Sequence, residues 1–131
     1  MHSEPAALFL FAHQDDEYGV FHRIEQCVRQ GLRVHCAYLT DGATPAATAQ
    51  QRNRESLAVL DRLGVPAHHV TFAGEQLGVP DAGLAERLPD AMSRAADGVV
   101  SAAISSMIVH CVAARSDTPS AAATSHASAT A

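Results

Sequence analysis

Apolar residues occur along this chain either in short continuous runs or at helical spacing, and the two patterns alternate. The run from Ala6 to Phe11 has the length of a strand and the unbroken apolar character of a strand that is covered on both faces. Arg33 to Leu39 predicts a second strand, closed by a turn signal, and His69 to Ala73 predicts a short third strand.

A segment with apolar residues at helical spacing follows each of these strands. The first helix is expected from about Tyr18 to Gln30 and the second from about Gln51 to Leu63, each before a glycine suited to a helix C-terminus. A third helix, after a loop rich in Gly and Pro, contains Leu84, Leu88 and Met92, and its internal proline is expected to kink it. This order predicts an α/β fold with a parallel, right-handed, three-layer sheet.

The last part of the chain differs in composition from the rest. From Ala113 to Ala131, 15 of the 19 residues are Ala, Ser or Thr, and such a segment cannot bury enough apolar surface to offset its ordering entropy. One domain is therefore expected over residues 1–112, with a disordered tail over 113–131. Periodicity does not decide whether Gly98 to Val112 forms a strand or a helix.

The composition argues against several classes of binding partner and indicates where in the cell the protein is expected. A net charge of −5 at pH 7 argues against nucleic acid or an anionic membrane as the main partner. The three cysteines have no paired spacing, which is typical of small buried side chains. The first residues lack the pattern of a signal peptide, and Val99 to Ala114 is too short and too polar to span a bilayer, so a cytoplasmic location is expected.

One imidazole and three carboxylates follow the first strand directly, in Ala12-His13-Gln14-Asp15-Asp16-Glu17. Open α/β sheets place their chemistry at the carboxyl ends of the strands. His13 and Asp16 can point to one place if the chain turns there, and imidazole with carboxylate suits zinc. Asp15 between them could take a proton from metal-bound water. In the alternative interpretation, Asp15 or Asp16 only caps the following helix and His13 is satisfied at the strand end.

The motif resembles the Ala-His-Pro-Asp-Asp-Glu of the PIG-L/LmbE family of zinc-dependent de-N-acetylases. Two further features support the resemblance, which runs from about Ala6 to Val65. Thr40-Asp41-Gly42 follows the second strand, and Arg52-Asn53-Arg54-Glu55 enters a helix that ends in Leu63-Gly64-Val65. The resemblance implies a Rossmann-like fold and hydrolysis of an N-acetyl group from a small-molecule substrate, an N-acetylated amino sugar or its conjugate.

The resemblance also implies roles for individual residues. By position, His13 and Asp16 would be Zn²⁺ ligands, Asp15 the general base, and Arg52 a residue near the substrate pocket. In a purely structural alternative, Arg52 forms an i,i+3 surface pair with Glu55. The absence of a G-x-G-x-x-G after the first strand argues against a nucleotide-binding module.

The chain departs from the family pattern inside the motif, where Gln14 replaces proline. Proline would fix φ, so a freer and less preorganised loop is expected. It also lacks the downstream Gly-His-Pro-Asp-His-like motif that supplies the third metal ligand, and the two later histidines, His110 and His126, have no suitably spaced carboxylate. The fold is therefore expected to be incomplete at its C-terminal side.

The missing motif leaves a second interpretation open, in which the chain is a catalytically defective, truncated or frameshifted relative. Ser116-Asp117-Thr118-Pro119, in GC-rich codons read one base out of frame, can encode Gly-His-Pro. A shift of frame between about Pro89 and Arg115 would account for both the absent motif and the unusual tail.

Overall fold

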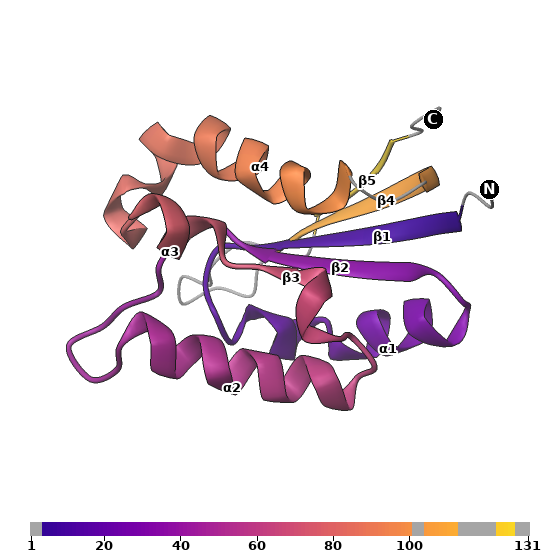
Figure 1. Cartoon of the computed structure of the whole chain (residues 1–131), viewed down its shortest axis with the longest axis horizontal. Helices are drawn as coiled ribbons and strands as arrows, with labels where there is room; N and C mark the ends of the chain where they lie inside the picture. The colour runs from indigo at the N-terminus through magenta and orange to yellow at the C-terminus, as the bar shows by residue number, and fades with distance from the viewer. Residues whose placement is uncertain (1–3, 101–103, 113–122, 128–131) are drawn as a thin grey trace.

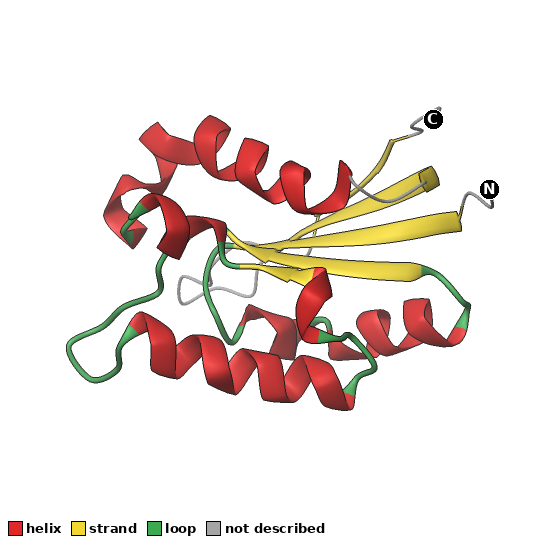
Figure 2. Ribbon diagram, viewed as in Figure 1, coloured by secondary structure: helices red, strands yellow, loops and turns green. Residues whose placement is uncertain are grey.

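The computed structural model describes residues 4–100, 104–112 and 123–127, in which five strands form one sheet in the order β3-β2-β1-β4-β5 (Figures 1 and 2). The strands are β1 (Glu4–Phe11), β2 (Arg33–Tyr38), β3 (Val70–Thr71), β4 (Ile104–Val112) and β5 (Ala123–Ala127). The first four run parallel, and β5 is antiparallel to β4 at the edge. The predicted α/β class and the parallel core of the sheet are confirmed.

Helices cover both faces of the sheet and complete the three layers of a Rossmann-like arrangement (Figure 1). Helices α1 and α2 lie on one face, and α3 and α4 on the other. The helical elements are η1 (Asp16–Gly19), α1 (Phe21–Arg29), α2 (Ala49–Arg62), η2 (Ala67–His69), α3 (Ala73–Leu77), η3 (Asp81–Gly83) and α4 (Leu84–Val100). Helix α3 was not expected, because its segment has the Gly-rich composition of a loop.

Strand β1 supplies side chains to two separate cores. Successive residues of a strand point to opposite faces, so Phe9 and Phe11 pack with Ile24 of α1 and Leu60 of α2. On the other face, β1 packs against α4 through Ala6, Leu8 and Leu10 on the strand and Ala91, Ala95 and Val99 on the helix. Burial on both faces explains why the sequence of β1 is apolar without alternation.

Helix α4 turns a different face to the sheet from the one that its largest apolar residues indicate. Leu88 and Met92 are 37% and 42% exposed, whereas Ala91 and Ala95 are almost fully buried. Small side chains let the helix approach the sheet closely, so alanine spacing decides which face is buried. Pro89 lies inside the helix, which continues beyond it.

The C-terminal part of the structure adds two strands to the sheet. Within Gly98 to Val112, α4 extends to Val100 and strand β4 begins at Ile104. Residues 123–127, which belong to the tail expected to be disordered, form β5, whose backbone groups pair with those of β4. The rest of the expected tail, residues 113–122 and 128–131, lies outside the described residues. Within the described segments, no helix has both the length and the apolarity to cross a membrane.

The strand order places the motif at the point where the connections of the sheet reverse direction. The chain proceeds from β1 to β2 and β3 on one side and then crosses to β4 on the other side of β1. In open α/β sheets, ligands bind at such a reversal, outside the carboxyl ends of the two strands concerned. His13 follows the end of β1 there, and the residues that follow β4 at the same edge are among those not described.

The histidines beside β2 predict a pH dependence of stability. His35 is 6% exposed and stacks on His69, with ring centroids 4.6 Å apart. Burial, with smaller effects of His69, Arg33 and His68, lowers the pKa of His35 from 6.5 to about 4. The unfolded chain therefore binds more protons between these two pH values, and we expect the free energy of unfolding to fall as pH decreases from about 6.5 to about 4.

Chemical denaturation at a series of pH values measures this dependence. His35→Gln removes the group and should flatten the slope between pH 6.5 and 4, whereas His22→Gln, at an exposed position of α1, should leave it unchanged. An unaltered slope in His35→Gln would contradict the assignment.

Candidate active site

The chain reverses direction after β1 through a backbone conformation that few residues adopt. Asp15 has a φ of 78° and is the one described residue other than glycine at positive φ. Aspartate tolerates this region better than most residues. Two backbone bonds close the turn, from Asp16 N to His13 O (3.4 Å) and from Tyr18 N to Asp15 O (3.0 Å). The turn sends three consecutive acidic side chains in different directions.

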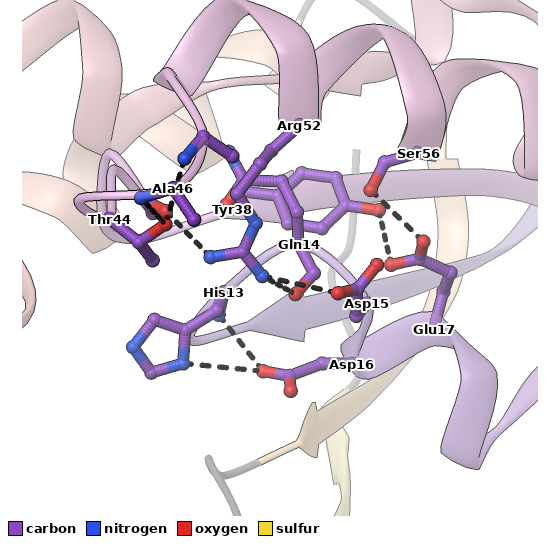
Figure 3. A network of polar contacts seen from close by, with 12 residues as sticks. His13, Gln14, Asp15, Asp16, Glu17, Tyr38, Thr44, Ala46, Arg52 and Ser56 are labelled. Carbon is purple, nitrogen blue, oxygen red and sulfur yellow. Dashed lines mark hydrogen bonds and ion pairs between the residues drawn. The ribbon is translucent and has the colours of Figure 1, made fainter.

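The three acids consequently lie in three environments (Figure 3). The side chain of Asp15 is 75% exposed and that of Asp16 is 16% exposed, whereas Glu17 is only 2% exposed. Asp15 occupies the N-cap position of η1 but makes no side-chain capping bond to it.

Glu17 anchors the motif to the core. Its carboxylate accepts hydrogen bonds from Tyr38 Oη of β2 (2.8 Å) and Ser56 Oγ of α2 (3.0 Å) (Figure 3). Burial and the neighbouring Glu17 raise the pKa of Tyr38, which therefore stays protonated and remains a donor. Sequence reasoning assigned Glu17 no role, because its two partners lie on elements that only the fold brings together.

His13 and Asp16 face each other beyond the carboxyl end of β1. Nδ1 of His13 lies 3.9 Å from Oδ2 of Asp16, which also accepts a hydrogen bond from the backbone N of His13 (2.9 Å). Burial raises the pKa of Asp16, although its hydrogen bond from His13 opposes this change. A cation beside the carboxylate would offset the cost of its burial.

The pair fits two ligands of a zinc ion. Tetrahedral zinc with nitrogen and oxygen ligands at about 2.0–2.2 Å holds those two atoms about 3.3 Å apart, so a small rotation of either side chain would suffice. In the described ranges, no group of three or more His, Cys, Asp or Glu residues could hold a metal ion.

A further acid, Asp81 of η3, contacts His13 on its other ring nitrogen. Nε2 of His13 is hydrogen-bonded to Oδ1 of Asp81. A carboxylate on Nε2 favours the tautomer with its proton there, which leaves the Nδ1 lone pair directed towards Asp16. The adjoining loop is held because Asp41 N donates to the O atom of the buried Val79 (2.8 Å). Only the position of Asp81 after the third strand could have indicated it from sequence.

Arg52 of α2 braces the motif loop. Its guanidinium donates to Gln14 O (2.8 Å), to Gly42 O (2.6 Å) and to the carboxylate of Asp15 (3.3 Å) (Figure 3). No ion pair joins Arg52 to Glu55 in the described part of the chain, so the surface-pair alternative is wrong. Arg52 thus lies at the motif.

The side chain of Gln14, which replaces the proline of the family pattern, makes hydrogen bonds to two other segments. This side chain is 1% exposed, and its Nε2 donates to Asp41 O (3.2 Å) and to Asn53 Oδ1. Asp41 itself forms an Asx turn, with its Oδ1 accepting from Ala43 N (3.0 Å). Polar contacts hold the loop where a proline ring would otherwise stiffen it.

The later histidines do not join this site in the described structure. His110 is 4% exposed, pairs with Phe9 across the sheet and stacks on its ring at 4.4 Å, inside one of the cores. His126 lies on β5 opposite Ile108, in the outer part of the sheet. The segment Ser116-Asp117-Thr118-Pro119, where a frameshift would have removed the family motif, lies outside the described residues.

An imidazole and a carboxylate thus face each other after the first strand of an α/β sheet, and a second, exposed carboxylate comes from the same loop. The family model described as PIG-L, GlcNAc-PI de-N-acetylase, matches residues 8–130, and the chain belongs to this family. Membership indicates a deacetylase-type function. No curated protein and no solved structure matches the chain.

The contacts of Glu17 predict a measurable cost for removing either donor. Tyr38→Phe and Ser56→Ala should each lower the free energy of unfolding by about 1–3 kcal/mol, because a buried carboxylate loses a hydrogen bond while packing is largely kept. Urea denaturation measures the change. Tyr18→Phe, at an 80% exposed tyrosine, is the matched control and should have little effect. Equal stabilities of Tyr38→Phe and the control would refute the anchoring role.

Proposed function

We propose that this protein hydrolyses the N-acetyl group of an N-acetylated amino sugar or its conjugate, with Zn²⁺ held by His13 and Asp16. The observation that carries the proposal is that Nδ1 of His13 faces the carboxylate of Asp16, at 3.9 Å, beside the exposed Asp15. Family membership supports the reaction type. When bound, zinc would polarise the amide carbonyl and lower the pKa of its water to about 7.

The residues of the motif have distinct tasks in this reaction. Asp15 acts as the general base, since its side chain projects from the turn into solvent and can take a proton from water and pass it to the departing amine. Arg52 holds Asp15 by an ion pair, and in this proposal it lies near the substrate. Asp81 keeps the ring of His13 oriented towards Asp16.

A second candidate is a catalytically defective relative that lacks the third metal ligand. It is favoured by the absence of a three-residue metal group within the described residues. Zinc stoichiometry on purified protein, with acetate release from an N-acetylglucosamine-type substrate, separates the two. Bound zinc with turnover supports the hydrolase, and metal-free protein without acetate release supports the defective relative.

Substitution of the motif separates the proposed roles. Asp15→Asn should keep bound zinc and lower the rate of acetate release by about 10²–10⁴-fold, because only proton transfer is lost. His13→Ala and Asp16→Ala should lose both zinc and turnover. Asp90→Asn, which removes an exposed partner of Arg87 on α4, is the control and should match the wild type. Full zinc content in His13→Ala would exclude the proposed ligand.

Because Asp81 contacts His13, we expect replacement of Asp81 to change the affinity for zinc without removing a ligand. Asp81→Asn should weaken zinc binding by about 10–100-fold, because the ring of His13 loses the carboxylate that orients it. Competition with a chromophoric chelator gives the affinity, and Asp61→Asn, on the exposed side of α2, provides the control. An unchanged affinity in Asp81→Asn would show that Asp81 does not support the ligand.

A further inference from the structure

The side chain of Gln14 is buried within the motif, between the proposed metal ligand and the proposed base. Its Nε2 donates to two acceptors on different segments, Asp41 O after β2 and Asn53 Oδ1 on α2. Its backbone O accepts from Arg52 (2.8 Å). The residue that replaces the proline of the family pattern is therefore held at both its backbone and its side chain.

The orientation of the Gln14 and Asn53 side-chain amides depends on a residue of a third element, helix α3. Asn53 Nδ2 donates to a carboxylate oxygen of Glu75 on α3, and the other oxygen of Glu75 accepts from Gln50 (3.2 Å). A carboxylate only accepts, so the NH₂ group of Asn53 faces Glu75 and its oxygen faces Gln14. Because the oxygen of Asn53 can only accept a hydrogen bond, the group of Gln14 that faces it is the NH₂ group. A single charge on α3 thus fixes the direction of two successive amides.

Gly42 provides the space that this arrangement needs. Gly42 has a φ of 68°, and a Cβ placed there would lie 1.7 Å from Oε1 of Gln14. Any larger residue would displace the Gln14 amide. The oxygen of Gln14 therefore rests against a backbone without a side chain, while its nitrogen is directed to Asn53.

We propose that Glu75 is a positioning residue for the motif, acting through a relay of Glu75, Asn53 and Gln14 that replaces the conformational restraint of proline. Proline restricts φ covalently, whereas glutamine leaves φ free and needs external contacts to order the same loop. Three buried or half-buried polar side chains from three segments supply those contacts. The relay concerns the geometry of the loop and holds whether or not the protein hydrolyses an amide.

Hydrogen exchange of the His13 amide tests the relay, because this N–H donates to Asp16 Oδ2 only while the loop keeps its shape. Glu75→Ala should accelerate this exchange about tenfold, the effect of one lost hydrogen bond, and leave Phe9 of β1 unchanged. Glu75→Gln keeps an acceptor for Asn53 and should restore most of the protection. Glu55→Ala, on the exposed side of α2, is the control.

Combining substitutions at Glu75 and Gln14 distinguishes a relay between these residues from an effect confined to α3. Gln14→Pro restores the covalent restraint, so Glu75→Ala in that background should no longer accelerate exchange at His13. If Gln14→Pro does not fold, Gln14→Ala serves instead, and adding Glu75→Ala to it should produce no further acceleration. Unchanged exchange in Glu75→Ala, or additive effects in the double variant, would overturn the proposal. None of these readouts depends on zinc or on turnover.

Discussion

The arrangement of the whole site depends on the left-handed backbone turn at Asp15. A chain that continued from β1 directly into a regular helix would place its acids at successive angles around one axis. At positive φ the chain reverses instead, so that Asp15 projects into solvent, Asp16 faces His13 and Glu17 enters the core. The three acids, which have nearly the same chemistry, lie in three different environments because the backbone turns at Asp15.

Such a turn is maintained only if the surrounding structure holds it. Three residues of the motif are bound to elements that lie far along the chain: His13 to η3, Gln14 to α2 and the loop after β2, and Glu17 to β2 and α2. Arg52 adds contacts to the backbone of the loop and to the base itself. Several elements thus determine a geometry that the local sequence alone would leave loose.

Sequence patterns predicted the elements well where the burial of a segment was uniform. The unbroken apolar run of β1 indicated a strand between two layers, and both cores contact it. The pattern of large apolar residues did not indicate the packed face where the contact surface consisted of small residues. In α4, Leu88 and Met92 dominate the pattern, but Ala91 and Ala95 face the sheet because they permit a close approach. The composition of the tail similarly gave no sign of β5, whose stabilisation comes from pairing with β4.

The sequence by itself determined the α/β class, the position of the motif at the end of the first strand, and the family, because apolar runs and short-range spacing are properties of the chain. Only the tertiary structure decided that Glu17 anchors the core, that Asp81 reaches the far side of the His13 ring, and that Gln14 replaces a proline by hydrogen bonding. These contacts join residues 21 to 68 positions apart. Such pairs become neighbours through the packing of α2, η3 and β2 around β1, and no local pattern encodes which of them will meet.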